Sequence, residues 1–307
     1  MIDRAALELF ERSIRQATET HSGEALDTAL DELGWLDALA TDPRAAVSIL
    51  FERQGAANAT SSALEWLLAA NLGLEGSVVV PALGRWDPPG EFDGRRLRVH
   101  GLGRGSRVVA SANEKDLAFD VSTAGLDVRP VRGVDPWLGL VEVTGDVVDI
   151  EAQPVMGWDA AIALGRLAVG HELVGASRTM LSLAREHALE RIQFGRPIAT
   201  FQAVRHRLAE ALVAIEAAGA VLDAAWLDRS PQTAAMAKAV AGRAARTTTR
   251  HCQQVLAGIG FTTEHPLHRY VRRVLVLDQL LGSSKVLTVL LGRDLLQTRR
   301  LPPLLPL

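Results

Sequence analysis

The chain has 307 residues, of which 48% are apolar, and its formal net charge at pH 7 is -3. This length and composition allow a folded protein of more than one domain and exclude a disordered chain. The small negative charge argues against nucleic acid or an anionic membrane as the main partner. The single cysteine, Cys252, excludes an internal disulfide and a cysteine-based zinc site, and we expect no bound metal.

Two further features bear on where the protein works. The first 19 residues are charged throughout and lack the apolar segment of a signal peptide. No apolar run reaches the roughly 18 residues of a membrane span. We therefore expect a cytoplasmic protein without a membrane segment.

Residues 4–75 show apolar residues at helical spacing, for example Leu26, Leu30 and Leu33. Pro43 suits the first turn of a helix, and Asp42 before it suits the cap. This pattern predicts an N-terminal helical domain over residues 1–76, reduced in size.

The pattern changes to short alternating runs after Gly76. Turn residues separate these runs at close intervals, which is typical of a small antiparallel barrel or sandwich. No long helix fits between Gly76 and Gln153, which excludes a βαβ dinucleotide-binding fold. We predict a middle β domain over residues 77–153, with strands at 77–82, 96–100, 107–110, 117–121, 126–131, 140–143 and 147–150.

Residues 154–307 return to helical spacing. Small residues recur at steps of three and four between 164 and 190, which suits close helix packing. Further helices are expected at 201–226 and 233–256, and a last antiparallel pair at 267–281 and 285–297. The sequence thus predicts an α+β protein: an N-terminal helical domain, a small middle β domain and a C-terminal four-helix bundle.

A sharp corner separates the first two bundle helices, at residues 191–198 (RIQFGRPI). Gly195 and Pro197 are sufficient to make a corner, because glycine tolerates unusual backbone angles and proline stops a helix. Arg191 and Phe194 are not needed for it. They indicate a binding site, although Arg191 alone is also explained as a cap of the helix end.

A second motif, QVLAGIGFTTEH at residues 254–265, follows the third bundle helix. Gly258 in this motif is explained either by a helix C-cap or by close approach of the backbone to a ligand. Taken with the corner, in this order and at this spacing, the motif resembles the acyl-CoA dehydrogenases. These are flavoproteins that oxidise the Cα–Cβ bond of an acyl-CoA thioester.

The resemblance implies a cofactor, FAD, shared across a subunit interface. In this family the bundles pack in pairs, and the two motifs of one subunit hold the pyrophosphate end of the FAD bound by the other. The chemistry of these residues agrees with this role. A guanidinium donates two parallel hydrogen bonds to phosphate oxygens, and a side-chain amide also donates to them. The residues that the resemblance assigns to the partner's FAD are Arg191, Gln193, Phe194, Gln254 and Gly258.

The catalytic base of the family is missing from its two usual positions. Proton abstraction requires a carboxylate beside the thioester's Cα. The resemblance places that carboxylate at Leu281 or at Gly165, and neither residue takes a proton. Asp278, three residues before Leu281, and Glu172, two turns after Gly165, are weak candidates. Both are better explained as acids on a helix surface or in an ion pair.

The β region also departs from the family. Between Gly76 and Val143 there is neither the Thr-Glu-Pro type of flavin loop nor the Trp-Ile-Thr type of segment. These absences resemble the non-catalytic β subunit of α2β2 acyl-CoA dehydrogenases, similar to those of bacterial steroid side-chain degradation. The implied partners are a longer catalytic subunit that supplies the base and most of the pocket, the acyl-CoA substrate, and an electron-transfer flavoprotein as acceptor.

Two alternatives stay open on the sequence. One is a self-sufficient homo-oligomeric dehydrogenase with a relocated base, Asp278 or Glu172. The other is a flavin-free scaffold that reuses the bundle to bind another protein, which the joint presence of Arg191, Gln254 and Gly258 disfavours.

Overall fold

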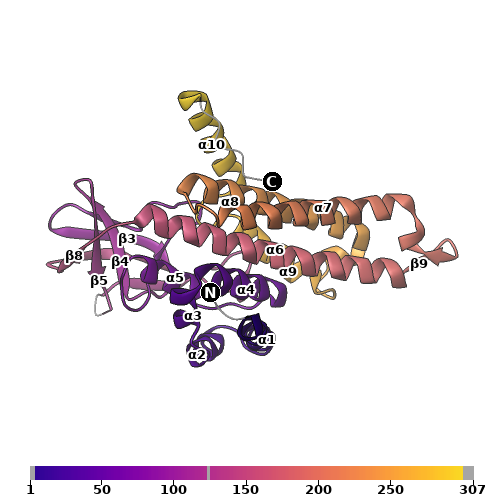
Figure 1. The fold of residues 1–307 in the computed structure, drawn as a ribbon, viewed down its shortest axis with the longest axis horizontal. Helices are drawn as coiled ribbons and strands as arrows, with labels where there is room; N and C mark the ends of the chain where they lie inside the picture. The colour runs from indigo at the N-terminus through magenta and orange to yellow at the C-terminus, as the bar shows by residue number, and fades with distance from the viewer. Residues whose placement is uncertain (1–3, 123–124, 300–307) are drawn as a thin grey trace.

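The computed structural model describes residues 4–122 and 125–299 (Figure 1). Helices come first, a sheet lies in the middle of the chain, and helices follow again, which confirms the predicted α+β fold class. Within the described residues, no helix is long and apolar enough to cross a lipid bilayer.

The N-terminal helices form because capping and apolar spacing coincide. Asp42 caps α4 as predicted: its carboxylate accepts a hydrogen bond from the Ala45 N–H, and Pro43 occupies the first helical position. The helices are α1 Arg4–Thr20, α2 Glu24–Glu32, α3 Trp35–Thr41, α4 Pro43–Ala57 and α5 Ala63–Asn71.

The middle of the chain forms one sheet in the order β6-β7-β3-β2-β4-β5-β8, with β1 paired to β3. All neighbours are antiparallel except β2 and β4. The sheet buries a core of its own around Leu97, Val108 and Phe119. Its strands are β1 Val80–Pro81, β2 Gly90–Phe92, β3 Arg96–Leu102, β4 Arg107–Ala112, β5 Lys115–Asp120, β6 Asp127–Pro130, β7 Val141–Val148 and β8 Ala152–Val155.

The predicted strands lack β2 and β8 and divide β7 in two. The two short strands expected at 140–143 and 147–150 are a single strand, β7. Gly145 does not end the strand, because it stays in the ladder opposite Val99 of β3. A glycine between two apolar runs is therefore not sufficient evidence of a turn, because it also fits inside a strand.

The C-terminal helices α6 to α9 pack together as a bundle, and α4 lies along α6. Gly55 of α4 and Gly175 of α6 make this crossing possible, because neither has a side chain. A Cβ on Gly55 would overlap the carbonyl of Glu172. A Cβ on Gly175 would overlap the carbonyl of Glu52. The elements of this region are α6 Trp158–Glu190, β9 Ile192–Gln193, β10 Arg196–Pro197, η2 Ile198–Thr200, α7 Gln202–Ala225, α8 Pro231–Leu256, η3 Ala257–Phe261, α9 Leu267–Leu277 and α10 Ser284–Thr298.

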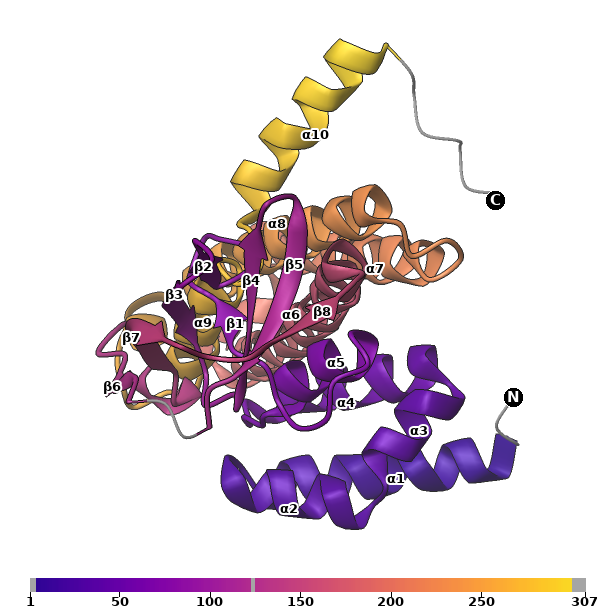
Figure 2. The ribbon, with the colours of Figure 1, turned by 90° about the vertical axis from the view of Figure 1, so that its left-hand side faces the viewer.

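The last helix, α10, corrects another expectation. It does not pair with α9 but projects away from the bundle (Figures 1 and 2). It contacts α8 near its start, where Leu287 is buried against Ala235 and Ala239. The chain turns because Leu281 and Gly282 both adopt positive φ angles, 56° and 98°. Helical periodicity in the sequence cannot predict such a change of direction between two helices.

The crossing of α4 and α6 gives a test of the packing. We expect Gly175→Ala to lower the free energy of unfolding by about 2–4 kcal/mol, because its methyl group meets backbone that cannot yield. Gly219→Ala is the matched control in α7, where an added Cβ meets only the tip of Arg178 at 3.7 Å. That control should be neutral or slightly stabilising. Equal effects in urea unfolding would contradict the close crossing.

Candidate functional site

The corner motif forms a small hairpin at the end of the bundle far from the sheet (Figure 1). β9 and β10 pair with Gln193 opposite Arg196. Phe194 and Gly195 make the turn with φ angles of 53° and 75°. Phe194 is 91% exposed, and its ring meets the ring of Phe201 edge-on with 6.0 Å between the centroids. An exposed aromatic ring on a fixed turn is suited to contact a partner.

The second motif lies at the same end of the bundle. The His265 ring stands 6.5 Å from the ring of His187, which lies one turn before Arg191 in α6. Burial lowers the pKa of His187 and the Arg191 charge lowers it further, while burial and His187 lower the pKa of His265. Both rings are therefore favoured in their neutral form, and they connect the two motifs.

The five residues expected to contact FAD all lie on the exposed surface of this end. Across residues 4–122 and 125–299, the Arg191 guanidinium has no hydrogen bond or ion pair, and a Cβ built on Gly258 would meet nothing within 4 Å. The side-chain amide of Gln193 donates to the neighbouring Ile192 carbonyl, at 2.8 Å. A free guanidinium and an open glycine fit the phosphate groups of a dinucleotide.

The two expected base positions meet each other in the interior. A Cβ built on Gly165 of α6 would lie 2.7 Å from Cδ1 of Leu281 and 3.2 Å from Leu68 of α5. Leu281 is completely buried. The sequence identified both positions but could not show that they are in contact. In the structure they form an apolar joint, meaning a packed contact between α6, α5 and the loop before α10.

Basic side chains hold this loop by its carbonyl groups. Arg166 Nε donates to the Leu281 carbonyl at 3.1 Å. Lys238 Nζ donates to the carbonyls of Asp278 and Gly282 at 3.0 and 3.2 Å. Burial lowers the pKa of Lys238 to about 8, against the Asp278 charge that raises it. Sequence reasoning missed Lys238, because a lysine in an alanine-rich helix reads as a solvated residue.

Asp278 is the anionic member of the same network. Its side chain is buried and accepts from Arg246 Nε at 2.8 Å and from the Ser284 N–H at 3.1 Å. An ion-paired carboxylate with these donors stabilises the turn into α10. It does not point to free space in which a substrate could sit.

Glu172 lies in a different buried group. Arg273 Nε donates to Asp135 Oδ2 at 2.6 Å, and Arg273 Nη1 lies 3.5 Å from Glu172 Oε1. Oε1 accepts no hydrogen bond within the described residues. Burial raises the pKa of Glu172, against the lowering effects of the Arg273 charge and the Gln54 amide. The carboxyl group lines a cavity of about 290 Å³ between the N-terminal helices and the sheet.

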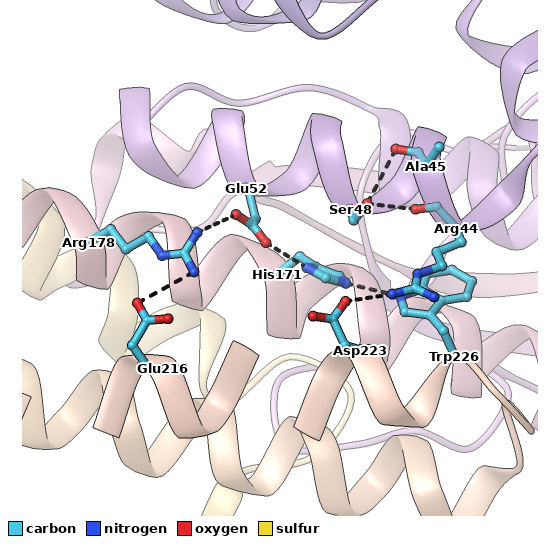
Figure 3. Close-up of polar contacts among 9 residues, drawn as sticks. All are labelled: Arg44, Ala45, Ser48, Glu52, His171, Arg178, Glu216, Asp223 and Trp226. Carbon is cyan, nitrogen blue, oxygen red and sulfur yellow. Dashed lines mark hydrogen bonds and ion pairs between the residues drawn. The ribbon is translucent and has the colours of Figure 1, made fainter. Parts of the chain in front are cut away.

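A Glu–His pair that the sequence did not indicate ties α4, α6 and α7 together (Figure 3). His171 Nδ1 lies 3.1 Å from Glu52 Oε1, and Trp226 Nε1 donates to His171 Nε2 at 3.0 Å. Arg178 pairs with the other oxygen of Glu52 at 3.0 Å and reaches Glu216 at 3.8 Å. Both ring nitrogens are occupied and the ring is buried. The pair is therefore structural and has no free position for a substrate proton.

The charge of Glu52 fits this structural role. Burial alone would raise its pKa, but the hydrogen bond and charge of His171 and the charges of Arg178 and Arg53 hold the pKa below its usual value. Beside this group, Arg44 pairs with Asp223 at 2.8 Å on the surface (Figure 3). The partners come from helices far apart in the chain, so no local pattern could reveal them.

Comparison with known proteins characterises the C-terminal region. Residues 156–296 match the acyl-CoA dehydrogenase C-terminal domain. The helical bundle of this chain is therefore similar to that of the acyl-CoA dehydrogenases.

Curated relatives match part of the chain, and solved structures share its fold. The chain is 34% identical over 157 residues to acyl-CoA dehydrogenase IpdE2 of Mycobacterium tuberculosis, a match that covers 51% of this chain and 48% of that protein. The chain thus spans about half the length of that relative. Its fold is similar to the Tcur3481-Tcur3483 steroid ACAD, with a TM-score of 0.78 at 21% identity over 95% of this chain and 98% of that one. It is also similar to the ChsE4-ChsE5 complex from Mycobacterium tuberculosis, with a TM-score of 0.77 at 19% identity over 99% of both chains.

Glu65 in the wall of the cavity gives a pH-dependent prediction. Burial raises the pKa of Glu65 to about 7, although a hydrogen bond from the Arg104 backbone acts to lower it. Between pH 4.5 and 7 the folded chain binds more protons at Glu65 than the unfolded chain, so this group's contribution to stability falls as pH rises. We expect Glu65→Gln to gain stability relative to the parent across this window, by up to about 1.4 kcal/mol per pH unit. Exposed Glu75→Gln controls for the substitution itself. In urea unfolding at pH 5 and pH 8, a difference that is constant with pH for Glu65→Gln would contradict the burial effect.

Proposed function

We propose that the chain is the FAD-supporting, non-catalytic subunit of an acyl-CoA dehydrogenase that desaturates acyl-CoA thioesters between Cα and Cβ. The proposed pathway is lipid or steroid side-chain β-oxidation in the cytoplasm. The base comes from a longer partner subunit in an α2β2 complex. The observation that carries the proposal is the apolar contact between Gly165 and Leu281, the two positions at which the family places its base.

This contact disfavours proton abstraction at either of the two positions. A base must lie within hydrogen-bond reach of the proton that it takes. Leu281 instead fills the space beside Gly165, and Arg166 fixes the Leu281 carbonyl behind it. An acid placed here would be buried against leucines without a solvated partner, which is unfavourable for its charged form.

The geometry of the two other carboxylates disfavours the self-sufficient alternative. Asp278 already binds Arg246 and Ser284. Glu172 lies beside Arg273, in a cavity whose other charged side chains include the acids Asp27 and Glu65. Acids around a flavin would oppose the negative charge that develops on its ring during reduction. Neither carboxylate is therefore well suited to act as the catalytic base.

The exposed end of the bundle supports the cofactor role. FAD, when bound by the partner, supplies the acceptor for the substrate hydride. In this proposal Arg191 and Gln254 hold its pyrophosphate, Gly258 lets the backbone approach, and Gln193 and Phe194 border the rest. The exposure of these residues and the free Arg191 guanidinium support it.

The similar structures support the choice of partner. One is named as a complex of two proteins and the other as a steroid ACAD with two protein names. For this chain we propose a second acyl-CoA dehydrogenase subunit as partner, acyl-CoA as substrate and an electron-transfer flavoprotein as electron acceptor.

Replacing Arg191 tests the cofactor role. In the complex with the catalytic subunit, we expect Arg191→Ala to weaken FAD binding about 10- to 100-fold, because one guanidinium–phosphate contact is lost. FAD affinity is measured by fluorescence titration of the apo-complex. Arg185→Ala, at an exposed position two turns earlier in α6, is the matched control and should leave affinity unchanged.

An unchanged affinity in Arg191→Ala, with the complex intact by size-exclusion chromatography, would contradict the proposal and favour the flavin-free scaffold. An equal loss in both variants would also contradict it, because it would indicate a general effect of positive charge rather than a specific contact.

A further inference from the structure

An exposed tryptophan beside α9 marks a surface that the candidate site does not include. Trp137 lies in the short helix η1 Pro136–Leu138 and is 47% exposed, whereas tryptophan is on average highly buried. The Asp135 carboxylate fixes this turn, because it accepts from the Trp137 N–H at 3.2 Å and from Arg273 Nε of α9 at 2.6 Å. The indole ring is therefore presented to solvent on a rigid support.

Two arginines of α9 border this ring. The guanidinium carbons of Arg269 and Arg272 lie 5.5 and 5.7 Å from the ring centroid, and the His268 ring meets it edge-on at 5.9 Å. In the described part of the chain, no ion pair joins either arginine to a carboxylate. These cation–π contacts are not needed to hold the turn, because Asp135 and Arg273 already do so. Both guanidinium groups thus keep donors for a group outside the chain.

An apolar pocket continues this surface along α9. It has a volume of about 240 Å³, and Leu83, Val134 and Leu275 in its wall are between 37% and 53% exposed. Arg272 lies one helical turn before Leu275, so the arginines, the indole ring and the pocket are neighbours. Exposed apolar side chains beside a tryptophan and arginines have the composition of a protein interface. We call Trp137, Arg269, Arg272 and this pocket the α9 surface.

The α9 surface is continuous with the end of the bundle that we propose to support FAD. His268 Nδ1 donates to the His265 carbonyl at 2.8 Å, and the His265 ring faces the ring of His187 at 6.5 Å. His187 lies one turn before Arg191 in α6. A subunit that brings its own FAD to Arg191 lies against this end, and the α9 surface is the adjoining area that it can cover. This continuity favours that subunit as the occupant.

We propose that the α9 surface is a docking site for the catalytic subunit, which binds it through a segment that carries an apolar side chain beside a carboxylate. The apolar side chain fills the pocket, and the carboxylate accepts from Arg269 and Arg272. Tryptophan and arginine side chains that lose their water on association dominate the binding energy of many interfaces. The arginine–carboxylate contacts add orientation and specificity. This docking role rests on the proposed function, which supplies the partner.

Assembly of the coexpressed complex tests the α9 surface. Mass photometry of the diluted complex measures the dissociation constant between this chain and the catalytic subunit. We expect Trp137→Ala and Arg272→Glu each to raise that constant about tenfold or more. Leu9→Ala and Arg15→Glu, at exposed positions of α1, are the matched controls and should leave it unchanged. Circular dichroism checks that each variant is folded.

FAD affinity separates this docking role from the cofactor role. At concentrations at which the complex is intact, Trp137→Ala should bind FAD as tightly as the parent. A loss of FAD affinity in the intact Trp137→Ala complex would assign the α9 surface to the cofactor site and overturn the docking role. An unchanged FAD affinity in Arg191→Ala contradicts the cofactor role and leaves the effect of Trp137→Ala on assembly to be judged by itself.

A photo-cross-linker identifies the occupant without any change to Trp137 or the arginines. The complex is irradiated with p-benzoyl-phenylalanine in place of Val134, or in place of Leu9 as the control. We expect a covalent product with the catalytic subunit from position 134 and none from position 9. A product with a second copy of this chain, or no product from position 134, would overturn the proposal. So would dissociation constants of Trp137→Ala and Arg272→Glu within about twofold of the parent.

Discussion

The apolar contact between Gly165 and Leu281 is the constraint on which the rest of the structure depends. It joins α6 and α5 to the loop before α10, and Arg166 and Lys238 bind that loop through its carbonyl groups. Close packing makes the joint intolerant of change, because a side chain at residue 165 would collide with Leu281. The loop that carries Leu281 also turns the chain, so that α10 projects away from the bundle (Figure 2). The two positions at which the family resemblance places a catalytic base thus lie in contact inside the fold.

Polar groups are distributed in opposite ways at the two ends of the bundle. Near the sheet, buried charges such as Asp278 and Arg273 have partners inside the chain. At the far end, Arg191 and Phe194 are exposed and make few contacts of their own. Charges that are satisfied internally stabilise a fold, whereas exposed aromatic and arginine side chains on fixed turns are typical of binding surfaces. This contrast is why we assign support of a cofactor, and not the chemistry, to this chain.

Local pattern was enough to predict most helices and the order of the fold, because apolar spacing and caps such as Asp42 act within a few residues. The resemblance to the acyl-CoA dehydrogenases identified Gly165 and Leu281 as separate positions. It could not bring them together, nor find the His171–Glu52–Trp226 group, because these contacts join distant elements. Polar residues that face the interior of a bundle, such as Lys238, look like surface residues until the packing is known. The direction of α10 depends on two positive φ angles that no periodicity records.

The flavin content of purified samples tests the central claim most directly. The chain expressed alone and the chain coexpressed with its catalytic partner are compared by absorbance and protein quantification. The account predicts a colourless or poorly folded single chain, and a yellow complex with one FAD for each pair of subunits. A homo-oligomer of this chain that is saturated with FAD and oxidises acyl-CoA would contradict it.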